Sequence, residues 1–495
     1  MKSGISLYLP HVSDRERNFQ GGAAGMPRAF RIALGNLVAN IVPCTGGLLK
    51  KRAPVLLAGL DYTRPWTRDS AINTMNSAAL LLPEVMKNSL LIMLENDPEY
   101  GLRIGGQYWD AVIWILGAWT YVVQTGDREF LHTALKAGIN ALLYFEQTEY
   151  DETTGLFRGA ACYGDGVSAY PDRYAATVKG SGDIRDWAAA HPDERVCRRG
   201  EGLPMLALST NCLYYQAYRT ISRLEALAGQ EPQAIWEHKA KRLRQAINKH
   251  LWNAQRGSYD YFIDEKARCE HQEGIGISFA LLFGVADRAQ RESIFSNVYL
   301  TAHGIPCVYP AFARYKPYGD LPRHAGTVWP HIKAFWGNAA ARCGRIDLFN
   351  REMETFTDLI NRDNQCTEIY HPVSGKPYGG FQESQPCGEI KLFPTCHIQA
   401  WSATAYISLV IQGLFGCRFT GKGLFFSPCV PEKYSNAVVS GLKYREAELT
   451  IAVEGYGKQI KAIKIDNRQA EKACFPADIT GRHSVQIVME KTVSD

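Results

Sequence analysis

The sequence lacks several patterns that define structural classes. Its 13 cysteines are scattered from Cys44 to Cys474 without a C-x-x-C pair, which argues against a disulfide framework and against a structural zinc site. It has no stretch of about 18 apolar residues, and its first residues show no apolar segment followed by a small-residue cleavage site. We therefore expect a soluble, non-exported, cytoplasmic protein with reduced thiols.

An excess of one charge is also missing. The chain has 55 basic and 50 acidic residues, a net charge of +5, and no run of like charges that would follow a phosphate backbone. Neither G-x-x-x-x-G-K-[ST] nor a G-x-G-x-x-G between a strand and a helix occurs. We expect no nucleic-acid partner, no membrane partner and no phosphate-binding loop.

The histidines form no metal-binding pattern. None of four candidates makes a close i, i+4 pair with a neighbouring carboxylate: His271, His324, His331 and His397. We predict that they are hydrogen-bonding residues, and we expect no metal and no cofactor.

What the sequence does have is helical periodicity, which dominates from about residue 66 to 415. Residues 209–228 follow a Ser/Thr/Asn start with apolar residues at helical spacing. Similar segments lie near 28–40, 68–82, 84–95, 108–126, 128–147, 231–250, 271–284, 288–298, 327–343, 346–361 and 397–415. Twelve helices, mostly in consecutive pairs, predict an all-α (α/α)6 toroid with six inner and six outer helices.

The sequence pattern changes from helical to β-rich after Gly416. Short β-rich segments separated by Gly, Asn and Asp predict a small antiparallel, sandwich-like domain. We expect it to be a structural cap on the helical ring rather than a sugar-binding module. The predicted divisions are residues 1–60, a segment packing on the barrel, 61–416, the catalytic barrel, and 417–495, the accessory β-domain.

Five predicted helix starts place polar or aromatic residues just before an apolar run. They are W-T-R-D-S at 66–70, Q-Y-W-D-A at 107–111, H-Q-E-G-I-G at 271–276, H-A-G-T-V-W-P-H at 324–331 and H-I-Q-A-W-S at 397–402. Because they alternate along the chain, they predict that the inner helices start around one polar pocket. Long loops at 149–206, 300–326 and 361–396 are rich in aromatic residues and carboxylates, which suits a sugar ring.

These motifs resemble a known superfamily. W-x-R-D-S, Y-W-D, G-T-V-W-P-H at 326–331, T-E-I-Y-H-P at 367–372 and Q-A-W-S at 399–402 are similar to those of the six-hairpin (α/α)6-barrel glycosidases. Within that group the chain resembles the glucosidase domain of glycogen-debranching enzymes, and also glucoamylases and bacterial α-L-rhamnosidases. The resemblance covers roughly residues 60–416. It implies hydrolysis of a glycosidic bond with inversion.

Inversion needs two carboxylates, one protonated to assist the leaving oxygen and one ionised to activate water. The resemblance implies that the base is Glu368, with Glu383 and Glu389 of the same loop as alternatives. It places the acid at Asp165, in T-G-L-F-R-G-A-A-C-Y-G-D-G. Asp186, in R-D-W, is the rival, and Asp183 also stays open.

Other residues at the helix starts are predicted to bind the substrate. The resemblance implies that Arg68 and Asp69 grip sugar hydroxyls at the pocket floor. The other predicted substrate-binding residues would form a wall that stacks on the sugar ring and binds its hydroxyls. They are Tyr108, Trp109, Asp110, Glu273, Trp329, Gln399 and Trp401.

The sequence thus predicts an exo-acting, inverting glycosidase that takes an α-linked gluco- or related hexoside and needs no cofactor. Its partner would be an oligosaccharide or glycoside substrate, and the oligomeric state stays unknown. Two alternatives remain. One is a sugar phosphorylase on a similar barrel, in which phosphate replaces water. The other is a non-catalytic carbohydrate-binding protein.

Overall fold

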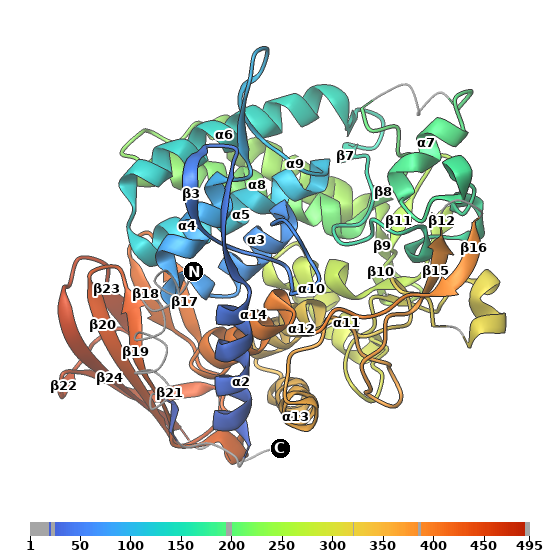
Figure 1. Ribbon diagram of the computed structural model, residues 1–495. Coiled ribbons are helices and arrows are strands. Elements are labelled where there is room, and N and C mark those ends of the chain that lie inside the picture. The colour runs from blue at the N-terminus through green and yellow to red at the C-terminus, as the bar shows by residue number, and fades with distance from the viewer. Residues whose placement is uncertain (1–18, 21–24, 195–199, 320, 385–387, 491–495) are drawn as a thin grey trace.

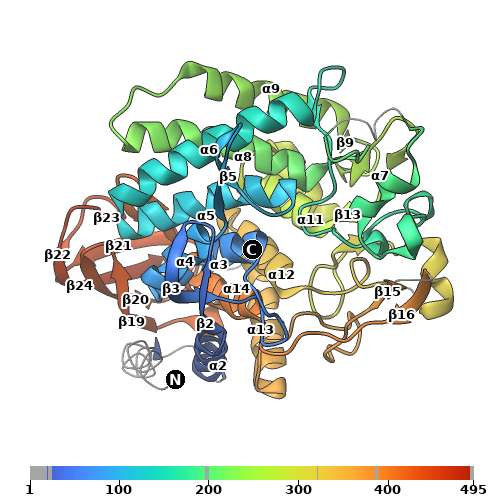
Figure 2. The same ribbon diagram turned by 45° about the horizontal axis from the view of Figure 1, so that its top comes forward.

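The computed structural model of the protein describes residues 19–20, 25–194, 200–319, 321–384 and 388–490. Helices form the larger part, and strands near the C-terminus form a separate sheet on one side (Figure 1). The long loops around α7 (Trp187–Ala190) lie on the opposite side, and the two views agree on this arrangement (Figure 2).

Each helix predicted from periodicity is present. The helices are α2 (Met26–Ala39), α3 (Thr67–Met75), α4 (Pro83–Leu91), α5 (Tyr108–Thr125), α6 (Arg128–Thr148), α8 (Leu208–Leu227), α9 (Ala234–His250), α10 (Gly274–Leu282), α11 (Arg288–Asn297), α12 (Pro330–Arg342), α13 (Ile346–Asp363) and α14 (Ala400–Ser408). The segment expected at 68–82 is interrupted at Ser77, whose φ of 73° cannot continue a helix, and resumes as a 3₁₀ turn at Ala78–Leu80. After Ser408 the last helix continues as a π-helix, Leu409–Leu414.

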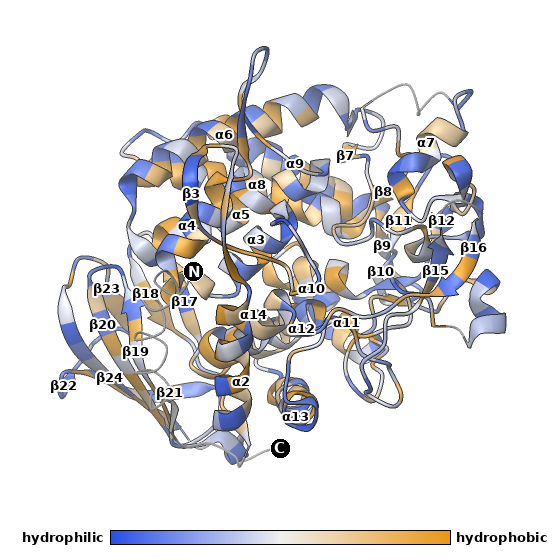
Figure 3. Cartoon of the chain, viewed as in Figure 1, coloured by the Kyte–Doolittle hydropathy of each residue, from blue (hydrophilic) through white to orange (hydrophobic). Residues whose placement is uncertain are grey.

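Six helices form a closed cycle of contacts. Helix α3 packs on α5, α5 on α8, α8 on α10, α10 on α12, α12 on α14, and α14 on α3. These six are the more buried helices, and every residue of α14 is buried. The outer helices are amphipathic, and α6 and α13 carry both apolar and hydrophilic stripes (Figure 3).

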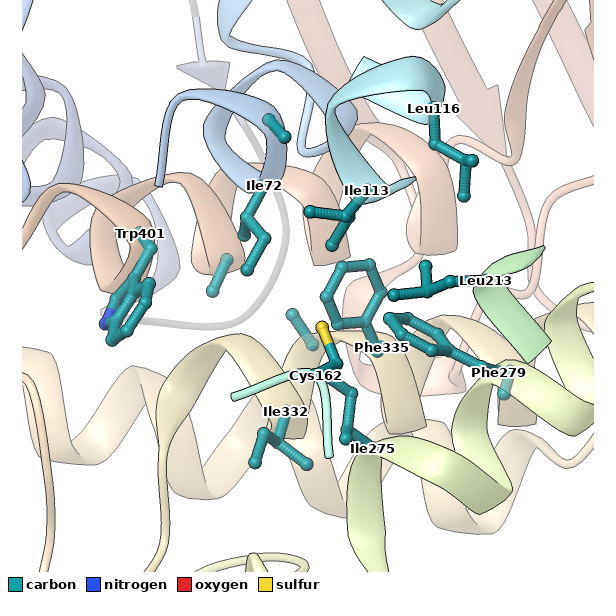
Figure 4. Close-up of a cluster of buried hydrophobic side chains, with 14 of the residues drawn as sticks. Ile72, Ile113, Leu116, Cys162, Leu213, Ile275, Phe279, Ile332, Phe335 and Trp401 are labelled. Atoms are coloured by element: carbon teal, nitrogen blue, oxygen red, sulfur yellow. The ribbon is translucent and has the colours of Figure 1, made fainter. Parts of the chain in front are cut away.

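The side chains at the centre of this cycle form the core. Ile72, Ile113, Leu213, Phe279 and Phe335 come from five different helices and meet between them (Figure 4). Four of them have no exposed surface, and Phe335 is 5% exposed. Burying a large apolar side chain contributes about 1.5–3 kcal/mol, so this layer holds the helix starts at fixed positions.

The C-terminal strands form a six-stranded sheet in the order β1-β19-β20-β24-β21-β22. Their bounds are β1 (Phe19–Gln20), β19 (Ala437–Tyr444), β20 (Ala447–Glu454), β24 (Gly481–Glu490), β21 (Gln459–Ile465) and β22 (Arg468–Gln469). A second sheet of three strands contains β17 (Cys417–Thr420), β18 (Gly423–Phe426) and β23 (Cys474–Pro476).

The prediction of a purely antiparallel domain is wrong in one respect. Strand β24 pairs with β20 in parallel, because the chain leaves the large sheet, adds β23 to the small one and re-enters beside β20. Strand β1 also joins β19, so the sheet includes residues from the N-terminal segment. Helix α2 of that segment packs on α13 and α14. The predicted boundaries at residues 60 and 416 stay predictions.

Short hairpins fill the connections. The hairpin of β2 (Ile41–Gly46) and β3 (Leu49–Leu56) precedes α3. The hairpin of β4 (Leu94–Asp97) and β5 (Gly101–Ile104) lies between α4 and α5. The loop strands are β6 (Tyr150–Asp151), β7 (Leu156–Phe157), β8 (Leu206–Ala207), β9 (Trp252–Asn253), β10 (Ser258–Tyr259), β11 (Phe262–Ile263), β12 (Arg268–Cys269), β13 (Gln272–Glu273), β14 (Val308–Tyr309), β15 (Phe381–Ser384) and β16 (Glu389–Leu392). Within the described ranges, no helix combines the length and apolarity needed to cross a bilayer.

Candidate active site

A cavity of about 240 Å³ opens where three of the predicted helix starts meet the long loops. Its walls are formed by Tyr62, Arg68, Asp165, Gly166, Gly182, Asp183, Arg323, His324, Trp329, Glu368, Gln382 and Trp401. Arg68 and Trp401 lie in the first turns of α3 and α14, and Trp329 is the residue before α12. Gln382 belongs to β15, and the remaining lining residues come from the connections between the helices.

Glu368 is held by three donors. Arg323 Nη2 donates to its Oε2 at 2.8 Å, and the backbone N–H of Cys396 donates to the same oxygen at 3.1 Å. The hydroxyl of Tyr62 donates to Oε1 at 3.0 Å. Only 2% of the Glu368 side chain is exposed, so these contacts fix the position of its carboxylate at the cavity wall.

Asp165 lies in the same cavity with different partners. Its Oδ1 is 3.2 Å from Nε2 of His324, and its Oδ2 is 3.6 Å from Nη2 of Arg68. Burial by itself would raise the pKa of Asp165, but Arg68 and His324 outweigh it and hold that pKa well below its usual range. About a third of the side chain, 36%, remains exposed to the cavity.

Arg68 is surrounded by three aspartates. Besides Asp165, its Nε is 3.9 Å from Oδ1 of Asp110, and Nη1 donates to the carbonyl of Cys162 at 3.0 Å. Burial raises the pKa of both Asp69 and Asp110 to about 7, against the opposing effect of Arg68. The cluster of Asp69, Asp110 and Asp165 therefore retains a proton near neutral pH, on Asp69 or Asp110.

Aromatic rings form another wall. The indole N–H of Trp329 donates to the carbonyl of Arg323 at 2.9 Å, and the guanidinium of Arg323 lies 5.6 Å from the centre of that indole. His324 stacks on Trp329 with ring centres 5.3 Å apart, and Trp401 lies 4.3 Å from the ring of His331. Burial holds the pKa of His331 well below its usual range, so this ring is neutral. Flat apolar faces beside polar groups suit a pyranose.

Buried polar atoms that have no hydrogen-bond partner among the described residues gather beneath the cavity. They include Nε of Arg68, Oδ1 of Asp69, Oδ1 of Asp110, both ring nitrogens of His331, both amide atoms of Gln399, Nε1 of Trp401 and Oγ of Ser402. Buried polar groups are normally hydrogen-bonded, so this concentration indicates a site for a hydroxyl-rich ligand or for water. Gln399 precedes α14 without capping it, and Ser402 lies inside the helix, so a simple serine cap does not explain this helix start.

Several predicted residues are not among those lining the cavity. Gln399 is buried ahead of α14, and Trp109 is buried within α5. Tyr108 begins α5, but its side chain lies outside what the structure describes. Glu273 is buried ahead of α10, where its Oε2 accepts the N–H of Ser209 at 3.0 Å.

The alternative carboxylates differ in position. Asp183 lines the cavity and pairs with Arg185 at 2.7 Å, whereas Asp186 is not among the lining residues described. Glu383 accepts from Arg314 at 2.8 Å and Glu389 pairs with Lys391 at 2.9 Å, both away from the cavity lining.

Sequence reasoning missed Tyr62, Arg323, His324 and Gln382 as site residues. Tyr62, Arg323 and Gln382 carried no signal of their own in the sequence, whereas His324 stood at the head of the H-A-G-T-V-W-P-H motif and was interpreted only as a hydrogen-bonding residue. Among the residues that the structure describes, no group of three or more His, Cys, Asp or Glu side chains is arranged to hold a metal ion.

A family model described as "Mannosylglycerate hydrolase MGH1-like glycoside hydrolase domain" matches residues 111–386, more than half of the chain. A curated mannosylglycerate hydrolase from Rubrobacter radiotolerans is 26% identical over 254 residues, 50% of this chain and 51% of the relative. The chain thus spans about half the length of that relative.

Solved structures show the same fold at low sequence identity. A sialidase superposes with a TM-score of 0.67 at 15% identity, covering 92% of this chain and 40% of that one. A GH63 mannosylglycerate hydrolase from Thermus thermophilus in complex with glucose superposes with a TM-score of 0.58 at 15% identity, covering 76% of this chain and 98% of that one. A GH78 family rhamnosidase from a Bacillus species superposes with a TM-score of 0.53 at 14% identity, covering 96% of this chain and 44% of that one.

The matched region contains both Asp165 and Glu368, and the rhamnosidase likeness expected from the motifs is present at the level of the fold. The predicted superfamily of six-hairpin glycoside hydrolases is confirmed. The chain belongs to the mannosylglycerate hydrolase MGH1-like family of glycoside hydrolases.

Proposed function

We propose that this protein is an exo-acting, inverting glycosidase that hydrolyses an α-linked gluco- or related hexoside, with Glu368 as base and Asp165 as acid. One observation carries the proposal: both carboxylates line a single small cavity between aromatic rings and buried polar atoms. The closed cycle of inner helices supports the finer description of the fold as an (α/α)6 toroid.

The reaction divides the two carboxylates by role. Glu368 takes a proton from a water molecule as that water attacks the anomeric carbon, while Asp165 donates a proton to the glycosidic oxygen as the C–O bond breaks. The products are the free sugar with inverted configuration and the alcohol of the leaving group. Attack and departure take place on opposite faces of the ring, so each carboxylate serves one face.

The contacts of Glu368 suit a base. Arg323 and the N–H of Cys396 hold one oxygen, while the other accepts the Tyr62 hydroxyl as its one hydrogen bond from the described residues. Burial, and next the charge of Glu368, raise the pKa of Tyr62 far above neutrality, so Tyr62 stays a donor. These contacts orient the carboxylate and leave lone pairs on Oε1 for water.

The contacts of Asp165 explain how it acquires a proton. In the free protein Arg68 and His324 keep it ionised, while the neighbouring Asp69 and Asp110 retain the proton of the cluster. A sugar filling the cavity removes water from the exposed third of Asp165, and desolvation raises the pKa of a carboxyl. The proton then moves to Asp165, which faces the leaving oxygen.

The size of the cavity supports exo action. Pockets for drug-sized ligands measure about 300–1,000 Å³, and this cavity of about 240 Å³ is smaller. It fits one sugar ring rather than a chain. Because the curated relative is named for mannosylglycerate and a solved neighbour holds glucose, α-mannosides and α-glucosides with small leaving groups are the first substrates to test.

Three further expectations remain proposals. The domain boundaries stay at residues 60 and 416, with the β-domain as a cap. A reducing, cytoplasmic location fits the eleven cysteines within the described residues, all of which are free. A glycoside is the proposed partner.

The test is product analysis on mannosylglycerate and a panel of α-linked disaccharides, each with and without phosphate. Release of free hexose without phosphate supports a glycosidase. A phosphate requirement with a sugar phosphate product would instead establish the phosphorylase. Binding without turnover of any member would leave a carbohydrate-binding protein.

A further inference from the structure

A second and larger cavity, of about 780 Å³, lies at the other end of the inner helices. The last residues of four helices line it, namely Met75, Leu227, Leu282 and Arg342. The β17–β18 hairpin contributes residues 417–422 and Phe425 to its wall, and Figure 1 shows these strands beside the helices on the side of the C-terminal sheet.

An apolar layer separates the two cavities. Trp401 lines the first cavity, whereas Leu116 and Phe335 line the second. Figure 4 shows Ile113 and Phe279 meeting Phe335 between the helices, and the first two have no exposed surface. The second cavity is therefore a separate site and not an extension of the first.

The charge of the second cavity is of one sign. Five basic side chains line it, Arg219, Arg223, Arg342, Arg418 and Lys422, and none of the lining residues that the structure describes is acidic. These residues come from α8, α12 and the β17–β18 hairpin, so the fold assembles a cationic group that no local run in the sequence shows.

Capping of helix ends does not account for this charge. Arg342 donates to the carbonyl of Leu282 at 3.4 Å and Arg219 to that of Phe283 at 3.3 Å, both long contacts, and Arg219 also donates to the hydroxyl of Tyr215 at 3.2 Å. A helix C-terminus carries about −0.5 elementary charge, so four of them supply roughly −2. Glu237 of α9, which does not line the cavity, partly offsets through its negative charge the lowering of the Arg223 pKa by burial. The five formal positive charges of the lining still exceed these negative contributions.

The arginines also oppose one another. Burial, followed by the neighbouring charge of Arg418 and a weaker effect of Arg223, lowers the pKa of Arg342 to about 10. Burial and Arg219 lower the pKa of Arg223 in the same way. Like charges that lie close together repel, and an anion between them relieves that repulsion.

Buried donors provide an independent observation. Asn76 and Thr220 are lining residues of the same cavity, and the amide nitrogen of Asn76 and the hydroxyl of Thr220 have no hydrogen-bond partner among the described residues. Their side chains belong to residues that are 1% and 0% exposed. Unpaired buried donors are uncommon, and both groups have the chemistry to donate to an oxyanion.

We propose that this second cavity binds a small polyatomic anion with at least two negative charges, of the phosphate or carboxylate class. The volume lies within the range of about 300–1,000 Å³ typical of ligand pockets, which exceeds what a single inorganic ion requires. Arginine forks pair with phosphate and carboxylate oxygens in two-point contacts, and Asn76 and Thr220 supply neutral donors. The proposal does not depend on the catalytic assignment.

The test is isothermal titration of the full chain with pyrophosphate and with citrate, with glucose as the neutral comparison. We expect saturable binding of at least one anion, weakened by added salt. Arg418→Gln and Arg342→Gln should each raise the Kd by about tenfold or more, because each removes a charge-assisted contact. Arg418→Lys should recover part of the affinity.

Two control variants make the result decisive. Arg242→Gln removes an exposed arginine on α9 outside the lining, and Arg323→Gln removes one of the two arginines of the first cavity. Both should bind the anion as the unmodified protein does. Absence of saturable binding, equal losses in Arg242→Gln and Arg418→Gln, or loss in Arg323→Gln alone would each overturn the proposal. A preference for pyrophosphate or citrate would distinguish the two chemical sources.

Discussion

Replacing Asp165 by Asn removes the proposed acid while keeping its size. This carboxylate lies 3.2 Å from His324 and 3.6 Å from Arg68. The substitution therefore also removes the negative charge beside both residues. General acid catalysis contributes about 10²- to 10⁴-fold, and each factor of ten corresponds to about 1.4 kcal/mol of barrier. We therefore expect kcat/KM on a natural α-glycoside to fall by about 10²- to 10⁴-fold.

The leaving group distinguishes a proton donor from a structural residue. A dinitrophenyl glycoside of the same sugar departs with little protonation, so Asp165→Asn should lose far less activity on it. Asp186→Asn is the matched control, since Asp186 is not among the described residues lining the cavity, and it should change both rates little. Equal losses on both substrates in Asp165→Asn, or a selective loss in Asp186→Asn, would refute the assignment.

Three further predictions concern charge. Arg323→Gln should lower kcat by about 10- to 100-fold with a smaller effect on KM, because a hydrogen bond to a charged group contributes about 1.5–3 kcal/mol and this one orients Glu368. The pH profile of kcat/KM should fall above about pH 7, because Asp69 and Asp110, with pKa values raised to about 7, then lose the proton of the cluster. Burial raises the pKa of Glu273 to about 8, so the folded state keeps a proton on this side chain that the unfolded state releases. The free energy of unfolding should therefore decrease as the pH rises from about 4.5 to 8. Glu273→Gln should reduce that decrease by a few kcal/mol, because each pKa unit corresponds to about 1.4 kcal/mol.

Controls separate these effects from general damage. Arg185→Gln removes a partly exposed pair with Asp183 and should change kcat by less than about fivefold. Glu389→Gln removes an exposed carboxylate and should leave the pH dependence of unfolding unchanged, as followed by denaturant titration at several pH values. An Arg323→Gln variant with full kcat, a kcat/KM that stays level to pH 9, or a Glu273→Gln variant with unaltered pH dependence would contradict the respective prediction.

Much of the helical part was predictable because its signals are local. An apolar periodic run preceded by a polar start defines α3, α5, α10, α12 and α14, and the structure begins each helix within or directly beside its motif. Arg68, Trp329 and Trp401 lie at those starts, and Asp165 and Glu368 were predicted from the family resemblance of the loop motifs. All five line the cavity.

What the sequence did not reveal depends on contacts distant along the chain. Tyr62 and Arg323 reach Glu368 across 306 and 45 residues, and no period or spacing links them. The parallel pairing of β20 with β24 also escaped prediction, because strand composition does not specify a partner or a direction. The cationic cavity is assembled from α8, α12 and the β17–β18 hairpin in the same way.

The most direct test of the central claim is proton NMR of the anomeric signals during the first turnovers of an α-linked substrate. Two carboxylates that serve opposite faces of the sugar predict immediate appearance of the β-anomer, with the α-anomer rising only later by mutarotation. Initial release of the α-anomer would show a retained configuration and contradict the assignment of Glu368 as a base acting through water.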